Sequence, residues 1–309
     1  MPRSPFLLLS AVGLAVLAVA CSGSGATIDF SEVETQAAAR ATVSSSEAIR
    51  MAVAPVFSPL PTFTLYQQLA DYMGEKLGRP VELVQGKTYA EINDLVKSGD
   101  VALALVCTNP YLQGQQDFGM ELLVAPLVQG EPYYYSLLIV RRDLDVSSLE
   151  ELRGVTFAFT DPLSNTGRLA PLYQLALRGE TPESFFSRSI FTYSHDNSIR
   201  SVADGIVDAA AVDSLVYDYL PVTEPDMMAR IKVIEKWGPF GINPFVVNPG
   251  LDPALKTLLR DVFLNMDKES RGQELLAEFM IDRFIVPDDS IYDSVREMRS
   301  YLQERGLSR

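Results

Sequence analysis

Hydrophobic and polar positions in the first half of the chain form short apolar runs separated by amphipathic stretches. The apolar runs predict buried strands at 48–53, 81–84 and 101–106. The amphipathic stretches between them predict helices at 63–77 and 89–97. A glycine follows each helix pattern closely, as is common where helices end.

The same order of elements returns further along the chain. Apolar runs predict strands at 155–159, 189–193 and 206–212, with helices at 166–177 and 197–203 between them. Alternation of strand and helix is typical of parallel sheets, and the repeated order indicates two similar lobes. We therefore expect an α/β protein in which 48–140 plus 240–309 form the first lobe and 141–239 the second.

The region after Pro225 predicts a return to the first lobe. Strand-like runs at 231–235 and 244–247 precede helix patterns at 253–265, 272–279 and 290–305. The stretch 236–241 is expected to cross between the lobes, and a first crossing is expected near 138–142. Two crossings form a hinge, which suits capture of a ligand better than catalysis.

In open sheets with parallel strands, ligands bind beyond the carboxyl ends of the strands. This rule selects positions without reference to any family. The selected positions are Ser58, Tyr89, Cys107 with Thr108 through Tyr111, 164–167, 193–196 and Asp213-Ser214. Two lobes that face each other across these edges predict a cleft that closes on a ligand.

The stretch 160–167, Thr-Asp-Pro-Leu-Ser-Asn-Thr-Gly, is the most informative of these. It joins a buried strand to a helix, so the first-turn amides lie at the sheet edge without internal partners and carry partial positive charge. The hydroxyls of Ser164 and Thr166, on either side of Asn165, add donors, and Gly167 lets a ligand come close. The turn therefore predicts an anion site. The alternative is an ordinary helix cap.

Two further side chains at the same edges offer donors to an oxyanion. His195, the single histidine of the chain, lies between a strand and a helix start, and it can bind an oxygen either charged or as a neutral donor. The phenol of Tyr89 can act in the same way. The alternatives are a cap or surface group for His195 and packing under a helix end for Tyr89.

Asp213 and Cys107 differ in kind from these donors. The Asp213 carboxylate repels a fully ionised anion but accepts a hydrogen bond from a protonated oxygen, which favours a phosphorus acid or an ammonium group over sulfate. Its alternative role is a helix cap. We interpret Cys107 as a small buried hydrophobe, with contact to a soft ligand such as trivalent arsenic as the alternative. Among Tyr133-Tyr134-Tyr135, at least one side chain is expected to face the space between the lobes.

Composition and the absence of catalytic motifs exclude several classes of function. The chain has 309 residues and a formal net charge of -14, which argues against nucleic acid as a partner. No phosphate loop, zinc spacing or nucleophile elbow is present in the sequence, so we expect no cofactor, no metal and no enzyme activity. A Cys107/His195 pair is the one candidate for thiol chemistry, and no third group is placed to orient the histidine.

The N-terminal residues predict export and a lipid anchor. An apolar stretch at 6–20 is too short to span a bilayer comfortably and fits an export signal. It ends in the sequence LAVAC, which resembles a bacterial lipoprotein signal and implies cleavage of 1–20 and lipid on Cys21. The segment 21–47, rich in serine, glycine and alanine, is expected to be a flexible tether. With Cys21 lipidated, Cys107 has no disulfide partner.

From about residue 47 to 302 the chain resembles the phosphate, phosphite and phosphonate-binding proteins of bacterial ABC transporters, which have a type II periplasmic binding fold. The resemblance rests on seven motifs taken in order. They are Tyr89-Ala90, Cys107-Thr108-Asn109-Pro110-Tyr111, Tyr134-Tyr135-Ser136, Asp161-Pro162-Leu163-Ser164-Asn165-Thr166-Gly167, Ser194-His195-Asp196, Val207-Asp208-Ala209-Ala210-Ala211-Val212-Asp213 and Pro239-Phe240-Gly241.

The resemblance implies oxyanion binding by the 164–166 turn, His195 and Tyr89, with an acidic partner in Asp213. Family members that take aminoalkylphosphonates use a second carboxylate near the return crossing, where this chain has Gly-Ile-Asn-Pro at 241–244. That departure counts against an amine-bearing ligand and favours phosphate, phosphite or a small alkylphosphonate. Related exported proteins that sense arsenite use a cysteine near the position of Cys107.

We therefore expect a lipid-anchored, monomeric receptor that captures a small oxyanion and delivers it to an ABC permease. The alternative is a sensory receptor coupled to a histidine kinase, with arsenite bound through Cys107. The anchor places the protein at the periplasmic or extracellular face of a membrane.

Overall fold

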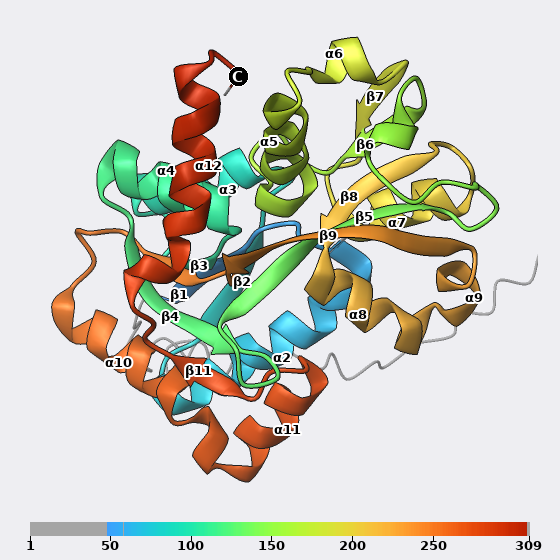
Figure 1. Cartoon of the computed structure of the whole chain (residues 1–309). Helices are drawn as coiled ribbons and strands as arrows, with labels where there is room; N and C mark the ends of the chain where they lie inside the picture. The colour runs from blue at the N-terminus through green and yellow to red at the C-terminus, as the bar shows by residue number, and fades with distance from the viewer. Residues whose placement is uncertain (1–47, 58, 308–309) are drawn as a thin grey trace, which may run out of the picture. The chain divides into compact units, whose positions relative to one another are not determined.

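The strands form two separate sheets in residues 48–57 and 59–307, which the computed structural model describes (Figure 1). The first sheet has the order β11-β4-β10-β3-β1-β2. Its strands are β1 (Ile49–Val53), β2 (Val81–Gln85), β3 (Leu103–Leu105), β4 (Glu121–Leu127), β10 (Phe245–Val247) and β11 (Arg283–Ile285). β1 pairs in parallel with β2 and β3, whereas β10 is antiparallel to β3 and β4.

The second sheet has the order β7-β6-β8-β5-β9. Its strands are β5 (Tyr133–Arg141), β6 (Thr156–Phe159), β7 (Arg188–Phe191), β8 (Ala209–Asp213) and β9 (Ile231–Gly241). β6 is parallel to β7 and β8, and β5 is antiparallel to β8 and β9. Every residue of β8 is buried, which is typical of a strand covered on both faces.

Helices cover both sheets. Those packed on the first sheet or on one another beside it are α2 (Pro59–Leu77), α3 (Tyr89–Ser98), α4 (Thr108–Phe118), α10 (Pro253–Leu264) and α11 (Ser270–Glu278). Those beside the second are α5 (Ala170–Leu177), α6 (Pro182–Phe185), α7 (His195–Ala203), α8 (Ser214–Thr223), α9 (Pro225–Met228) and α12 (Asp293–Glu304). Short helical turns are η1 (Glu150–Leu152), η2 (Asn165–Leu169), η3 (Met266–Lys268) and η4 (Asp289–Tyr292).

Local sequence explains where α3 begins and ends. The Thr88 hydroxyl accepts a hydrogen bond from the Glu91 amide and so caps the first turn. At the other end Gly99 adopts φ of 77°, a left-handed conformation that costs glycine little. The buried face of α3 includes Ile92 and Val96, four residues apart.

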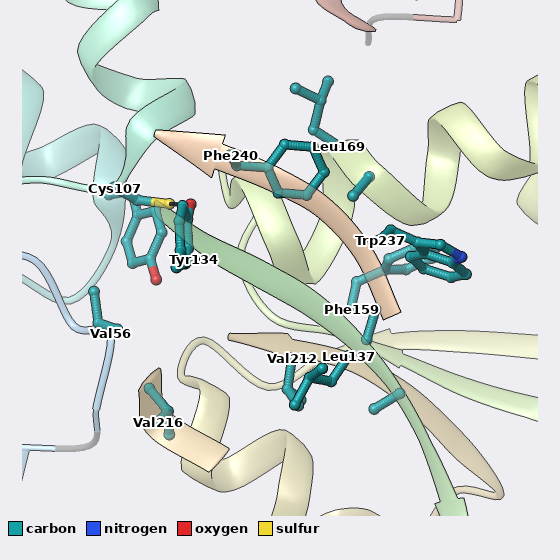
Figure 2. Close-up of a cluster of buried hydrophobic side chains, with 14 of the residues drawn as sticks. Val56, Cys107, Tyr134, Leu137, Phe159, Leu169, Val212, Val216, Trp237 and Phe240 are labelled. Carbon is teal, nitrogen blue, oxygen red and sulfur yellow. Dashed lines mark hydrogen bonds between the residues drawn. The ribbon is translucent and has the colours of Figure 1, made fainter. Parts of the chain in front are cut away.

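Two groups of buried side chains hold the structure together. One contains residues of both sheets, and Figure 2 shows part of it, with Leu137, Phe159 and Val212 of the second sheet. The other lies on the first sheet, where the rings of Phe245, Phe263 and Phe284 contact one another at 4.6 to 5.9 Å. Truncating such a ring to alanine typically costs about 3–5 kcal/mol of stability.

The last helix, α12, contacts both halves of the molecule. Its Tyr301 packs edge-on against Tyr173 of α5 at 5.1 Å. Its Arg299 donates to the side chain of Asn109 in α4. In Figure 1 this helix runs beside α5 and α4, so the end of the chain lies across the boundary between the sheets.

The α/β architecture with two sheets confirms the expected fold class. The first crossing, expected near 138–142, is wrong, because β5 lies wholly in the second sheet. The second crossing, expected over 236–241, is wrong as well, because these residues belong to β9 of the second sheet. The chain leaves the first sheet after β4 and returns to it between β9 and β10. The predicted first lobe ends at residue 140 and so includes β5, whereas strand pairing places β5 in the second sheet. The lobe boundaries stay a prediction. The leader and tether at 1–47 lie outside the described residues.

The elements that were not predicted include α4, β4, α6, α9 and β11. α4 has polar residues and a glycine where a helix usually shows apolar spacing, and β4 contains Pro126. Among the helices that the structure describes, none is long and apolar enough to cross a membrane.

Candidate functional site

Five helical N-termini approach one another at the carboxyl ends of the strands. They belong to α3, α4, η2, α7 and α8, which start at Tyr89, Thr108, Asn165, His195 and Ser214. Hydrogen bonds between the two halves tie them together. The Tyr89 amide donates to Asp161 Oδ2 at 3.2 Å, and the His195 amide donates to the Val56 carbonyl at 3.0 Å. Because each helix start carries partial positive charge, their meeting point favours an anion.

The turn after β6 has an unusual geometry. η2 is one turn of π-helix, with main-chain hydrogen bonds from Leu169 to Ser164 and from Ala170 to Asn165. A π-turn leaves one more first-turn amide without a main-chain acceptor than an α-turn does. Ser164 Oγ accepts from the Gly167 amide at 3.0 Å, so Ser164 is both the helix cap and part of the candidate site. The Thr166 amide has no main-chain acceptor within the turn, and its hydroxyl has no hydrogen-bond partner.

Gly167 has a different role from the one expected. A Cβ at this position would lie 2.2 Å from Thr160 Oγ1 and 3.0 Å from His195 Cε1. The absence of a side chain is therefore required by close packing of the turn on Thr160 and His195. The expectation that Gly167 makes room for a ligand has no support from these contacts.

His195 is fully buried and neutral. Its Nδ1 accepts a hydrogen bond from the Asp213 amide at 3.1 Å and lies 3.1 Å from Thr160 Oγ1. Because a backbone amide can only donate, Nδ1 is unprotonated and the proton sits on Nε2. Nε2 lies 3.4 Å from Ser164 Oγ. Burial lowers the pKa of His195 to about 3, so the ring acts as a neutral donor.

Cys107 lies in the same cluster. Its Sγ is 3.7 Å from the Tyr134 hydroxyl and accepts from the Asn165 amide at 3.5 Å (Figure 2). The Tyr134 hydroxyl in turn accepts from Asn165 Nδ2 at 3.0 Å. Burial raises the pKa of the Cys107 thiol to about 11, so the sulfur is a protonated thiol at neutral pH. A buried thiol of this kind is a poor nucleophile.

Asp213 closes the cluster from the end of β8. Its Oδ1 accepts from the Leu215 amide at 2.8 Å, which caps α8, and its Oδ2 accepts from Asn243 Nδ2 at 3.3 Å. Burial raises the pKa of the Asp213 carboxyl to about 7. Asp213 therefore combines the helix-cap role with a proton that exchanges near neutral pH.

Buried polar atoms without partners mark this region. Among the described residues they include Tyr89 Oη, Asn165 Oδ1, Thr166 Oγ1, Ser194 Oγ and Asn243 Oδ1. Tyr89 lies within the cluster, since its pKa is raised first by burial and then by Cys107, Asp161 and Asp213. Buried polar atoms are nearly always hydrogen-bonded, so several unpaired ones in one place indicate a ligand site. The three hydroxyls can donate to the oxygens of an oxyanion, and the two amide oxygens can accept from a protonated ligand oxygen.

Two predicted ligand residues have other partners. The Tyr111 hydroxyl donates to Asp289 Oδ1 at 2.7 Å, away from the cluster. Thr108 Oγ1 donates to the Gly241 carbonyl at 2.6 Å and so holds the end of β9. Ser58 lies outside the described residues. The structure therefore brings together Ser164, Asn165, Thr166, His195, Tyr89, Asp213 and Cys107, but not the Tyr111 hydroxyl.

Sequence reasoning did not name three residues of the cluster as ligand candidates. Tyr134 was one of three tyrosines expected to include a cleft residue, and strand pairing decides which of them faces inward. Asn243 carried no signal except that it follows the return crossing. Thr160 binds the histidine ring and Ser198, and it stands at the head of the predicted turn.

Two sheets linked by two crossings, with a polar cluster at the strand ends, give the chain the type II periplasmic binding protein fold. The family described as ABC transporter, phosphonate, periplasmic substrate-binding protein matches residues 51–292, and the chain belongs to this family. The family consists of transport proteins, which agrees with the expectation that the chain is not an enzyme.

Three relatives show the range of the family. The chain is 26% identical over 182 residues to the phosphonates-binding periplasmic protein of Escherichia coli, a match that covers 58% of this chain and 54% of that protein. It is 27% identical over 265 residues to the phosphate-import protein PhnD of Mycolicibacterium smegmatis, covering 82% and 79%. The structure of PhnD1 from Prochlorococcus marinus with methylphosphonate has a TM-score of 0.76 at 19% identity, covering 83% and 98%.

Proposed function

We propose that the protein is the extracytoplasmic receptor of an ABC importer and captures a small phosphorus oxyanion. The observation that carries the proposal is the convergence of five helical N-termini on buried polar atoms that have no partner in the protein. Such a site supplies preorganised donors for a tetrahedral anion without a fixed cation.

Neutral donors dominate the proposed site. His195 is uncharged, and the hydroxyls of Ser164, Thr166 and Tyr89 donate without carrying charge. Ser164 Oγ already receives the Gly167 amide, so its own proton is available to a ligand oxygen. The ligand therefore exchanges its water shell for oriented neutral dipoles.

Asp213 adds selectivity for an acid that keeps a proton. Its pKa of about 7 allows it to donate a hydrogen bond when protonated or accept one from a protonated ligand oxygen when ionised. Either arrangement places one proton between Asp213 and the ligand. Sulfate brings no proton at neutral pH, so it can bind only when Asp213 is protonated, whereas phosphate, phosphite or a phosphonate can bind in both states; sulfate is therefore expected to bind less well.

The names of the relatives support this ligand class. The relatives bind or import phosphonates and phosphate, and one neighbouring structure holds methylphosphonate. Lipid on Cys21, a tether over 21–47, a monomeric state and delivery to a membrane permease complete the proposal. A sensory receptor for arsenite through Cys107 is not favoured, because the sulfur is a buried, protonated thiol.

Calorimetry with the protein tests which ligands it binds. We expect saturable binding of phosphate, phosphite or methylphosphonate, weaker binding of sulfate and aminoethylphosphonate, and none of arsenite. Replacing Ser164 and Thr166 together by alanine removes two neutral donors and is expected to weaken binding about a hundredfold. Thr257→Ala, on the exposed side of α10, is the matched control. Unchanged affinity in the double variant rules out this turn as the site.

A further inference from the structure

An apolar cavity of about 140 Å³ adjoins the oxyanion cluster. Its walls come from the end of β1, α2, α8, β10, the end of α11 and β11. Most of the lining side chains are apolar, and Leu65, Val216 and Phe284 are examples. The polar residues of the lining are Gln129, Asp213, Asp218 and Asn243.

Three contacts show that the cavity borders the site. Asp213 and Asn243, which hydrogen-bond to each other across the two halves, line the cavity and also close the oxyanion cluster. Val56 lines the cavity with its side chain, while its carbonyl accepts from the His195 amide. The pKa of Tyr66 in the cavity wall is raised by burial and also by Asp213, which places the ring near that carboxyl.

The chemistry changes sharply at Asp213. On one side lie hydroxyls, amides and the imidazole of His195, and on the other lie aliphatic and aromatic side chains. A ligand that spans this boundary needs a charged, oxygen-rich head and an apolar body. Inorganic phosphate has four equivalent oxygens and no such body, whereas an organophosphonate has three oxygens and one carbon substituent.

We propose that the ligand is a phosphonate whose apolar substituent, of about four to six carbons or one phenyl ring, lies in this cavity. The proposal rests on the function proposed above and specifies its ligand. The size follows from the volume, because a cavity of about 150 Å³ lined by similar side chains holds one benzene molecule. The two carboxylates on the wall do not call for an ammonium group, since Asp213 already accepts two hydrogen bonds and the charge of Lys236 partly offsets that of Asp218.

The test compares ligands that differ only in the substituent. Methylphosphonate, butylphosphonate, phenylphosphonate, aminoethylphosphonate and phosphate are titrated into the protein by calorimetry. Each buried methylene strengthens binding about threefold to fourfold. Because one side of the cavity is open, we expect butylphosphonate and phenylphosphonate to bind about tenfold more tightly than methylphosphonate.

Substituting a larger side chain into the cavity wall tests whether the substituent of the ligand lies there. Leu65→Trp adds bulk to the wall in α2 and is expected to remove the preference for butylphosphonate while methylphosphonate affinity changes less than about threefold. Leu215→Trp, at the start of α8, is a second filling variant if the first fails to fold. Leu258→Trp adds the same bulk on the exposed side of α10, outside the cavity lining, and is expected to change nothing.

The outcomes separate the two proposals. If methylphosphonate or phosphate binds but the larger phosphonates bind no better, or if aminoethylphosphonate binds best, the cavity assignment is overturned and the oxyanion site stands. Equal weakening of all ligands by Leu65→Trp also overturns the assignment. If no phosphorus acid binds, the proposed function itself fails.

Discussion

The two halves of the site repeat one arrangement with different chemistry. In the first half, α3 begins at Tyr89 and β3 leads to Cys107, 18 residues later (107 − 89). In the second half, α7 begins at His195 and β8 ends at Asp213, again 18 residues later (213 − 195). Cys107 and Asp213 are the N-cap residues of the next helices, α4 and α8.

The two pairs differ in whether their side chains titrate near neutral pH. The first pair is a phenol and a thiol whose pKa values are both raised by burial, so neither ionises near neutral pH. The second pair is an imidazole held neutral and a carboxyl with a pKa of about 7, linked by a hydrogen bond from the Asp213 amide to His195 Nδ1. One backbone unit therefore supplies fixed donors in one half of the molecule and pH-sensitive recognition in the other.

Substitution of His195 is expected to cause the largest loss of stability and of ligand affinity. His195→Phe leaves the Asp213 amide, Thr160 and Ser164 without their ring partner. Buried polar groups that lose a partner cost about 1–3 kcal/mol each, so we expect about 3 kcal/mol of lost stability and ligand binding below detection. Urea denaturation and calorimetry measure the two losses. A variant with wild-type stability would show that these hydrogen bonds contribute little.

The matched change in the first half is Tyr89→Phe. Tyr89 Oη makes no hydrogen bond of normal length, although Ser164 lies close enough to lower its pKa, so its removal is expected to change stability little. Affinity for methylphosphonate is expected to fall about tenfold, since one hydrogen bond to an anion is lost. If affinity stays constant while stability drops, Tyr89 is a packing residue and the proposed role is wrong.

A pH series sharpens the comparison at Asp213. The folded pKa of about 7 lies above the ordinary value of 3.8 for an aspartic acid, so the folded state holds more protons between about pH 4 and 7. Asp213 therefore makes the free energy of unfolding fall as pH rises through that window. An anion favours the protonated carboxyl, so above pH 7 affinity is expected to fall by up to about tenfold per pH unit. In the Asp213→Asn variant only the titration of the ligand remains, so its affinity should depend less on pH. A pH profile of affinity identical to that of the wild type would show that Asp213 is not the titrating group.

The smallest effect is expected at Cys107. Cys107→Ala is expected to change affinity less than about threefold and to lower stability by about 1 kcal/mol, through the small cavity that it leaves. Because the wild-type thiol is buried with a pKa of about 11, it should resist alkylation by iodoacetamide until the protein unfolds. Rapid native alkylation would contradict both the burial and the passive role.

Sequence patterns predicted those site residues that have a polar side chain and also lie at a predicted strand end. Ser164, His195 and Asp213 carry polar groups at predicted strand ends, and the structure places all three in one cluster. Tyr134 and Asn243 could not be selected in this way, because their facing depends on strand pairing and on the return crossing. The π-turn at Asn165 also has no sequence signature, and the close packing of its Gly167 on Thr160 is visible only in the structure.

The position of α12 has a consequence for how far the molecule can open. The same helix carries Arg299, which holds α4, and Tyr301, which packs on α5. Separation of the two sheets must therefore break one of these contacts in addition to releasing the ligand. Deleting the chain from Arg299 onward would raise the population of open molecules and loosen the grip on any solute, although the deleted residues lie outside the oxyanion cluster.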